Sequence, residues 1–309
     1  MWEKKGLIYS VSGQNGFDFS HCHKPTPLIL DENILRIYFG VRDSKSITRT
    51  TFIDVDFSNI DKPKIIYKHN KPILDIGKIG AFDDSGANVS SVLRVGNKVF
   101  MYFIGWNPST TVHTRNSIGL AVSEDDGFSF KRLYDGAVLD RNHFEPYYTG
   151  AVDVILDEGF KIWYTSGSIW KMINDKPEIS YHIKYAESKN GVDWIRNDIS
   201  CILPNEEYEA TARPCVIKEK GTYKMWYSKR NIDGFRNNMN RGYRGGYAES
   251  IDGIVWERKD HLFGLEVSDE GWDSEAIAYP YVLNFKGIKF MFYNGNGFGK
   301  SGFGYAIER

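Results

Sequence analysis

The stretch GYAESIDGIVWERKD, residues Gly246–Asp260, has two relatives earlier in the chain. They are KYAESKNGVDWIRND at Lys184–Asp198 and GLAVSEDDGFSFKRL at Gly119–Leu133. Each joins two short runs of apolar and aromatic residues through an Asp-Gly or Asn-Gly pair, a pattern typical of two antiparallel strands and a tight turn. A hairpin that recurs three times indicates a fold built from repeated units.

A second motif shows how many repeated units the chain contains. Five apolar runs close on a tyrosine, and these tyrosines recur at intervals of 62 to 66 residues, at Tyr38, Tyr102, Tyr164, Tyr227 and Tyr293. Each unit has another apolar run before the tyrosine segment and a hairpin of the YAES type after it. Four antiparallel strands repeated five times predict a single all-β domain over residues 1–309, a five-bladed β-propeller. The expected blade units are about 15–70, 80–140, 145–203, 207–262, and 272–309 together with 1–10.

The two ends of the chain predict how the ring closes. The last unit ends at GFGYAIER and lacks a fourth strand, whereas the N-terminal WEKKGLIY at Trp2–Tyr9 resembles WERKDHLF at Trp256–Phe263. We therefore expect the N-terminal segment to supply the outermost strand of the fifth blade. Such closure leaves no sheet edge exposed at the junction.

Composition narrows the classes of function. Of 309 residues, 15% are aromatic, and the formal net charge of -1 comes from interspersed acids and bases. No basic surface for nucleic acid and no polybasic membrane patch is expected. The N-terminus lacks the apolar core of a signal peptide and no apolar run reaches membrane-spanning length, so we expect a cytoplasmic location. Cys22, Cys201 and Cys215 have no disulfide or zinc spacing and are interpreted as free thiols.

One turn also fits another class of propeller. SEDDGFSF at Ser123–Phe130 matches the Asp-box of sialidases, which have six blades. Because five periods fill this chain, we interpret the Ser, Asp and Gly of these turns as hairpin chemistry.

The starts of the inner strands and the ends of the middle strands share one rim of the ring, where we expect the functional site. Glu209 and Glu275 align in the pattern E-A-x-A-x-P-x-V, and Asp84 lies near the same level in the second blade. We expect these three carboxylates to converge on the axial funnel as catalytic acid and base, because like charges held close raise at least one pKa. The alternative is that they satisfy turns and backbone donors.

The other polar and aromatic residues predicted at this rim suit a sugar, whose ring stacks on flat side chains and whose hydroxyls need hydrogen-bond partners. The candidate substrate-binding residues are His21, His23, Arg42, Asp43, Trp106, Asn107, Arg213, Tyr279, Asn294 and Asn296. The expected ligand is a small-molecule sugar, an oligosaccharide or a nucleotide sugar. His21 and His23 alternate along a strand and face one side, but no third metal ligand has a recognisable spacing, so no metal and no cofactor is expected. Four tryptophans at blade-equivalent positions, Trp163, Trp194, Trp226 and Trp256, are expected to pack between blades.

Through GWDSEAIAYPYV, FMFYNGNGFGKSGFGYA and GYAESIDGIVWERKD, essentially the whole chain resembles the five-bladed propeller glycoside hydrolase superfamily. This superfamily includes arabinanases and β-xylosidases, invertases and levansucrases, and mannoside phosphorylases, and the resemblance is greatest to members encoded with bacterial surface-polysaccharide genes. The resemblance implies three catalytic residues. They are an aspartate in the first blade as base or nucleophile, an aspartate in the second blade that tunes the pKa within the catalytic site, and a glutamate in the third blade as acid. Asp84 matches the second of these and Glu145 in EPYYTG is the counterpart in the third blade, whereas the first blade offers His21 and His23 instead.

Two hypotheses of function follow. The first is a carbohydrate-active enzyme that acts on a glycosidic or sugar-phosphate bond of a surface-polysaccharide building block through carboxylates in the axial funnel. The alternative is a non-catalytic propeller that binds a glycan or nucleotide sugar in polysaccharide biosynthesis.

Overall fold

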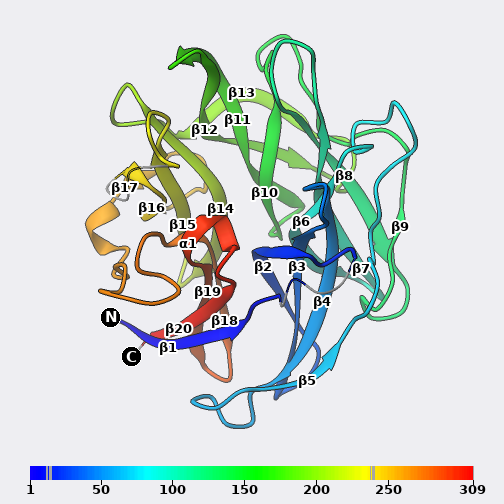
Figure 1. The fold of residues 1–309 in the computed structure, drawn as a ribbon, viewed down its shortest axis with the longest axis vertical. Helices are drawn as coiled ribbons and strands as arrows, with labels where there is room; N and C mark the ends of the chain where they lie inside the picture. Colours follow the sequence, from blue (N-terminus) through cyan, green and yellow to red (C-terminus); the bar gives the residue numbers. More distant parts are fainter. Residues whose placement is uncertain (12, 14–15, 237, 239–240, 309) are drawn as a thin grey trace.

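A computed structural model describes residues 1–309 except 12, 14–15, 237, 239–240 and 309. The chain forms five four-stranded antiparallel sheets arranged as the blades of a propeller (Figure 1). The first strands of neighbouring sheets contact one another around the ring, so blades 1 to 4 run outward from the axis in chain order, and blade 5 does so except for its outermost strand. The prediction of an all-β, five-bladed propeller is confirmed, and the six-bladed alternative is wrong for this chain.

The strands follow the predicted repeat. Blade 1 contains β2 (Ser20–Ile29), β3 (Ile34–Arg42), β4 (Thr48–Asp56) and β5 (Lys64–Lys68), and blade 2 contains β6 (Ala87–Val95), β7 (Lys98–Asn107), β8 (Arg115–Ser123) and β9 (Lys131–Arg132). Blade 3 contains β10 (Thr149–Leu156), β11 (Phe160–Ile173), β12 (Lys176–Ser188) and β13 (Ile195–Ile202), and blade 4 contains β14 (Glu209–Glu219), β15 (Thr222–Asn231), β16 (Arg244–Ser250) and β17 (Glu257–Arg258). Blade 5 contains β18 (Ala278–Phe285), β19 (Ile288–Asn294), β20 (Phe303–Glu308) and β1 (Trp2–Tyr9). The short helical segments are η2 (Asp260–Leu262) and α1 (Asn296–Gly299).

The ring closes as the ends of the sequence predict. Strand β1 pairs antiparallel with β20, with Trp2 opposite Glu308 and Leu7 opposite Gly304. The Trp2 ring also packs edge-on against Trp226 of blade 4, with 6.3 Å between ring centroids. The N-terminal strand thus completes blade 5 and joins it to its neighbour.

The recurring hairpin connects blades 2, 3 and 4 each to the blade before it. The hydroxyl of buried Tyr38 donates a hydrogen bond to the carbonyl oxygen of Gly127 at 2.7 Å, and Tyr102 donates to Gly191 in the same way at 2.7 Å. A Cβ at position 127 would lie 2.1 Å from the Tyr38 hydroxyl, and the φ of Gly127 is +78°, so only glycine fits this turn. The Ser123 hydroxyl accepts a hydrogen bond from the Gly127 amide at 2.8 Å, which confirms the hairpin interpretation of the Ser and Gly in this segment.

The predicted packing of the tryptophans is also confirmed. Trp163 of blade 3 is fully buried against Trp256 of blade 4, at 6.0 Å between ring centroids, and Trp194 of blade 3 packs edge-on against Tyr102 of blade 2. Trp226 meets Trp2, as described above. All three cysteines are buried free thiols, as expected.

Three inner strands share a distortion that shapes the axis. Lys24, Arg213 and Tyr279 have φ values of 53°, 55° and 55°, and each stands directly before a proline. The strand register shifts at each of these positions, which marks a β-bulge. Side chains of the preceding blade accept hydrogen bonds from these three backbone amides, from Lys24 to Asn294 at 2.7 Å, from Tyr279 to Ser228 at 2.7 Å and from Arg213 to Thr165 at 3.3 Å. The interfaces between blades therefore hold three large side chains at the axis in a left-handed backbone conformation.

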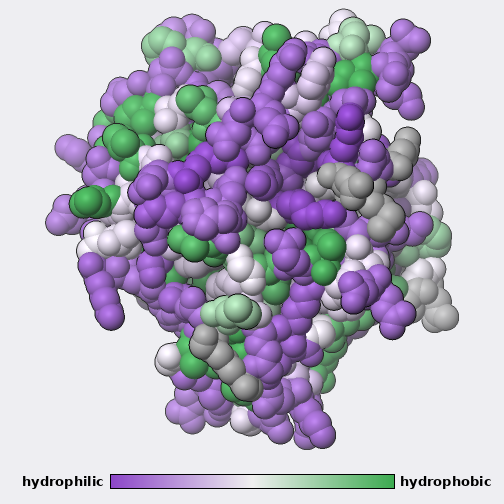
Figure 2. All heavy atoms as spheres, turned by 90° about the vertical axis from the view of Figure 1, so that its left-hand side faces the viewer, coloured by the Kyte–Doolittle hydropathy of each residue, from purple (hydrophilic) through white to green (hydrophobic). Residues whose placement is uncertain are grey.

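The surface seen from the left-hand side of Figure 1 is mostly hydrophilic, and its apolar side chains lie in small groups (Figure 2). Among the described residues, the helices are far too short to cross a membrane.

Candidate functional site

A cavity of about 340 Å³ lies on the axis, at the rim where inner strands begin and middle strands end. Blades 1, 2, 4 and 5 supply its walls. The described residues that line it are His23, Lys24, Arg42, Thr48, Gly86, Asn88, Ile104, Trp106, His113, Asn116, Arg230, Phe235, Arg236, Tyr243, Tyr279 and Phe298. This set is rich in cationic and aromatic side chains and contains no carboxylate.

Three cationic side chains of this axial cavity form no ion pair among the described residues. Lys24, Arg42 and Arg230 line it, and the fully buried Arg213 lies close enough for its charge to act on Lys24. Among the described residues, none of these four side chains forms an ion pair with a carboxylate, although the cavity-lining Arg236 pairs with Glu178. The charge of Arg213 acts on the buried Asp153, so Arg213 has a carboxylate nearby. Lys24, Arg42 and Arg230 have no such ion-pair partner among the described residues, and a cation held away from water without one is unfavourable, so these three side chains favour an anion in the cavity.

Neutral groups hold the cationic ones in place. The Nε of Arg42 donates a hydrogen bond to Nε2 of His23 at 3.0 Å, and the His23 ring stacks on His21 at 5.1 Å between centroids. The two rings therefore share one side of the strand, as predicted. Burial and the nearby Arg42 charge lower the pKa of His23 well below its usual value and that of His21 to about 4, so both rings are neutral at physiological pH.

Aromatic rings enclose the guanidinium group of Arg230. Its Cζ lies 3.6 Å from the centroid of the Phe235 ring, and its Nε donates to the hydroxyl of Tyr181 at 2.7 Å. The Tyr181 hydroxyl is in turn 3.1 Å from that of Tyr243. On the other side of the cavity, the Lys24 ammonium group lies 5.1 Å from the centroid of the Tyr279 ring. These contacts orient the cations without cancelling their charge.

Four of the ten predicted binding residues line the axial cavity, namely His23, Arg42, Trp106 and Tyr279. His21 stacks behind His23, and Arg213 is buried against the Tyr281 ring at 5.2 Å with one hydrogen bond to Thr26.

The other four predicted binding residues support the backbone. Asn294 is fully buried and bonds backbone groups of Lys24, Cys22 and Gly302, and the Asn296 Oδ1 accepts from the amides of Glu275 and Ala276. Asp43 caps the turn to Ile47 and pairs with Arg49, and Asn107 donates to Asp84 at 3.0 Å. A residue at the rim therefore does not always contact the cavity, because short polar side chains there form hydrogen bonds within their own loops.

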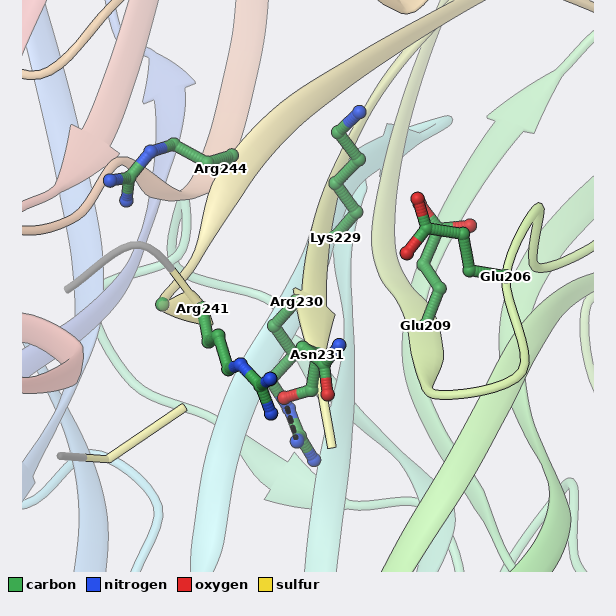
Figure 3. A pocket seen from close by; sticks show the side chains of 8 residues that line it. Glu206, Glu209, Lys229, Arg230, Asn231, Arg241 and Arg244 are labelled. Atoms are coloured by element: carbon green, nitrogen blue, oxygen red, sulfur yellow. Dashed lines mark hydrogen bonds between the residues drawn. The ribbon is translucent and has the colours of Figure 1, made fainter. Parts of the chain in front are cut away.

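The predicted convergence of three carboxylates is not observed. Glu209 lines a separate cleft of about 210 Å³ beside blade 4, with Lys229, Arg230 and Arg244 (Figure 3). Both of its oxygens accept hydrogen bonds from Arg258, at 2.9 and 3.0 Å. An opposite charge on its own blade thus holds Glu209 away from the axis.

Asp84 and Glu275 are also outside the axial cavity. The carboxylate of Asp84 accepts hydrogen bonds from Ser85, Asn107 and the Gly80 amide. Burial raises the pKa of Asp84, but these hydrogen bonds outweigh it and the pKa is lowered. A general acid needs a raised pKa instead. Glu275 is exposed and lines a third hollow of about 230 Å³, which shares Phe235, Arg236, Tyr243 and Phe298 with the axial cavity. Equivalent positions in two blades are related by rotation around the ring, so a shared sequence pattern does not bring their side chains together.

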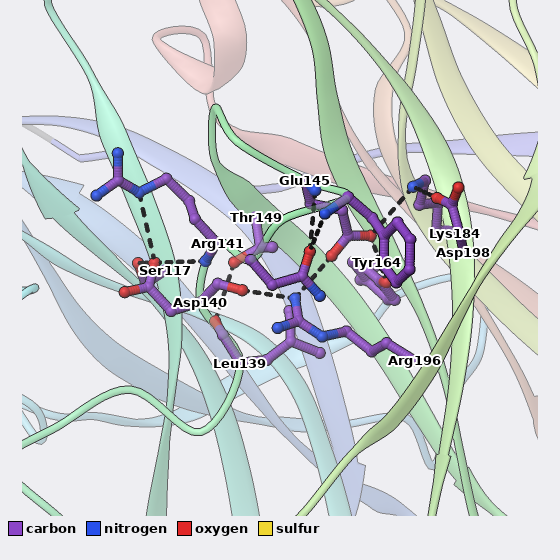
Figure 4. Close-up of polar contacts among 12 residues, drawn as sticks. Ser117, Leu139, Asp140, Arg141, Glu145, Thr149, Tyr164, Lys184, Arg196 and Asp198 are labelled. Carbon is purple, nitrogen blue, oxygen red and sulfur yellow. Dashed lines mark hydrogen bonds and ion pairs between the residues drawn. The ribbon is translucent and has the colours of Figure 1, made fainter.

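Glu145 is the residue of blade 3 that the family resemblance suggests as the acid. It is buried in a polar cluster (Figure 4) and does not line the axial cavity. It accepts hydrogen bonds from the Tyr164 hydroxyl and from Arg196, each at 2.6 Å, and lies 3.4 Å from the ammonium group of Lys184. Lys184 also pairs with Asp198. Every charge in this Glu145 cluster has a partner of opposite sign.

Several cavity residues were not predicted from the sequence, above all Lys24, His113 and Arg236. For Lys24 a signal was present, because Lys-Pro, Arg-Pro and Tyr-Pro recur in the inner strands of three blades. Arg236 and Tyr243 lie between β15 and β16, in a part of the sequence that contains no repeated motif. Among the described residues, no group of three or more His, Cys, Asp or Glu is arranged to hold a metal ion.

Comparison with known proteins identifies the relatives of this chain. No family model matches it. The chain is 35% identical over 308 residues to the uncharacterised protein MT1551 of Mycobacterium tuberculosis (strain CDC 1551 / Oshkosh), covering 99% of this chain and 98% of that protein. It belongs to the family of MT1551. The uncharacterised protein Rv1502 of M. tuberculosis (strain ATCC 25618 / H37Rv) is 34% identical over the same length.

Solved structures share the fold of this MT1551 family member at low sequence identity. A complex of BT0996 with RGII has a TM-score of 0.72 and 17% identity, over 98% of this chain and 90% of that protein. A member of the GH130 family of mannoside phosphorylases has a TM-score of 0.70 at 13% identity, over 100% and 94%, and a thermostable family-43 glycoside hydrolase has a TM-score of 0.63 at 17% identity, over 97% and 91%. The fold is therefore the glycoside-hydrolase-like five-bladed propeller.

Proposed function

We propose that this protein binds an anionic carbohydrate, a sugar phosphate or a nucleotide sugar, in its axial cavity. One observation carries the proposal. Lys24, Arg42 and Arg230 face the cavity without a carboxylate partner among the described residues, beside the aromatic side chains of Trp106 and Tyr279. An anionic group on the ligand would supply the missing counter-charge, and a flat ring would accept a sugar face.

The fold neighbours support the carbohydrate part of the proposal. They include complexes with RGII, with xylose and, for a Bombyx mori β-fructofuranosidase, with sucrose. We further propose that the ligand is a building block of a surface polysaccharide and that the protein acts in the cytoplasm, where phosphorylated and nucleotide-linked sugars are the activated forms.

The proposal is tested by isothermal titration calorimetry with glucose 1-phosphate, UDP-glucose and glucose. We expect binding of a charged ligand and little binding of glucose. Arg42→Met and Arg230→Met each remove one charge-assisted contact, which is worth about 2 kcal/mol or roughly 30-fold in affinity. Arg94→Met is the matched control, because Arg94 is exposed near the end of β6, pairs with Asp126 and does not line the axial cavity. Equal affinity for charged and neutral sugars, or no effect of the two cavity variants, would refute the proposal.

A second candidate is cleavage of a glycosidic or sugar-phosphate bond, with Glu275 as the acid or base. The observation that favours it is the hollow lined by Glu275, which shares four wall residues with the axial cavity. Glu275→Gln should lower turnover by about 100-fold or more while sparing binding of the charged ligand. Glu209→Gln is the comparison, because Arg258 already holds both oxygens of Glu209. Unchanged turnover in Glu275→Gln would remove this residue from the mechanism.

A further inference from the structure

Lys24 is held in an unusual backbone conformation. Its φ is 53°, it precedes Pro25, and its amide donates to the Oδ1 of the buried Asn294 at 2.7 Å. A left-handed non-glycine residue costs about 1–3 kcal/mol, and such conformations gather at functional sites. The hydrogen bond from Lys24 of blade 1 to Asn294 of blade 5 stabilises this conformation and so fixes the direction of the Lys24 side chain.

The surroundings of the Lys24 amine disfavour its charge. The charged groups that act on it are the guanidinium groups of Arg42 and Arg213, both of its own sign, and the titratable groups beside it are His21, His23 and Tyr279. No described carboxylate forms an ion pair with it. Burial first, and then the charges of Arg213 and Arg42, lower the pKa of Lys24 to about 7. Near neutral pH a large fraction of this amine is therefore unprotonated, whereas an exposed lysine, with a pKa of about 10.4, is less than about 0.1% unprotonated.

We propose that Lys24 is a reactive amine and that it condenses with the open-chain carbonyl group of an anionic sugar to form an imine. The identity of the ligand rests on the proposed function, whereas the reactivity of the amine rests on the contacts of Lys24 itself. The Nζ lone pair attacks the carbonyl carbon, the carbonyl π bond breaks, and the oxygen gains the proton that the nitrogen loses, which gives a carbinolamine. Loss of water from the carbinolamine leaves the imine, and hydrolysis reverses the sequence without any oxidant or reductant.

The rest of the axial cavity suits this step. Arg42 and Arg230 line the same cavity as Lys24 and can hold a phosphate, while the carbonyl end of the sugar reaches the amine. The neutral His23 keeps Arg42 in place through the 3.0 Å hydrogen bond and adds no further charge. The site thus combines an anion-binding part with a nucleophile.

The experiment traps the imine in the intact protein. Wild type is incubated at about pH 8 with glyceraldehyde 3-phosphate or glyceraldehyde and with cyanoborohydride, which reduces an imine to a stable amine, and labelled peptides are quantified by mass spectrometry. We expect Lys24 to be labelled at least about tenfold faster than Lys98, an exposed lysine paired with Glu124. Labelling should slow as the pH falls below about 7, and Lys24→Arg should remove the adduct while keeping the positive charge.

The outcomes separate this inference from the proposed function. Labelling of Lys24 no faster than of Lys98 overturns the inference, and calorimetry on the same preparation shows whether anionic sugars still bind. Faster labelling by glyceraldehyde 3-phosphate than by glyceraldehyde, with competition by inorganic phosphate, supports the reactive amine and also the anion-binding function of the cavity. Fast labelling that is indifferent to the phosphate supports the reactive amine and contradicts the anion-binding cavity.

Discussion

Two clusters of buried charge in this protein differ in one respect. In the Glu145 cluster of blade 3, the carboxylate meets Arg196, Lys184 and the Tyr164 hydroxyl, and Lys184 also meets Asp198. Lys24, Arg42 and Arg230 line the axial cavity, and none of the three forms an ion pair with a described carboxylate. Arg213 lies behind the lining, close enough for its charge to act on Lys24. The balanced cluster is complete as folded, whereas the unbalanced one needs a further group.

Whether a charged side chain has a partner of opposite sign helps to distinguish charges that support the fold from charges that await a ligand. The Glu145 cluster supports the fold, because removal of Glu145 would leave Arg196 without a carboxylate and Lys184 with Asp198 alone. In the axial cavity, burial lowers the pKa of Lys24 and of Arg42, so the charges of these two side chains disfavour the folded state. Natural proteins keep such unfavourable charges where a ligand binds. Opposite effects of substitution are therefore expected in the two places.

The largest effect is expected for Glu145→Gln. It leaves Lys184 and Arg196 without their central anion, so the free energy of unfolding should fall by about 3 kcal/mol. Urea denaturation measures this change, and binding of a charged sugar should stay at the wild-type value. A loss of less than about 1 kcal/mol would show that the two clusters do not differ in this way.

The affinity for an anion should depend on pH through Lys24. As pH rises through about 7, Lys24 loses its proton and one positive charge leaves the cavity, so affinity should fall by about tenfold between about pH 6.5 and 8.5. Calorimetry with glucose 6-sulfate avoids titration of the ligand itself. In Lys24→Arg the affinity should be flat over this range, and a parallel decline there would assign the effect to another group.

A smaller effect of the opposite sign to Glu145→Gln is expected for Arg42→Met. Removal of this cation relieves its repulsion of Lys24, so the melting temperature without ligand should stay the same or rise, by an amount equivalent to at most about 1 kcal/mol. Differential scanning calorimetry measures the shift. A clear fall in melting temperature would mean that Arg42 stabilises the fold, as the Glu145 cluster does.

The smallest effect on stability is expected for Glu275→Gln. The side chain is exposed, and its contacts with Asn296 are made by the backbone, so the free energy of unfolding should change by less than about 0.5 kcal/mol. Urea denaturation of this variant beside Glu145→Gln gives the contrast between a solvated and a buried carboxylate. A larger loss would show that the Glu275 carboxylate supports the rim.

The site was harder to predict than the fold. Strand alternation and the position of the rim were enough to find His23, Arg42, Trp106 and Tyr279. They were insufficient for Glu209, because its direction depends on Arg258, which is 49 residues away in the chain. The same limitation applies to Lys24, whose neighbour Arg213 is brought to it only by closure of the ring.

The sequence by itself determined the number of blades, the hairpins and the closing strand, because each depends on local patterns of apolar residues and glycine turns that recur at one period. Only the tertiary structure decided which charges meet at the axis, because pairing depends on distances between blades and on bulges that redirect single side chains. Hydrophobic periodicity is repeated along the chain, whereas the balance of charge is set by residues far apart in the sequence.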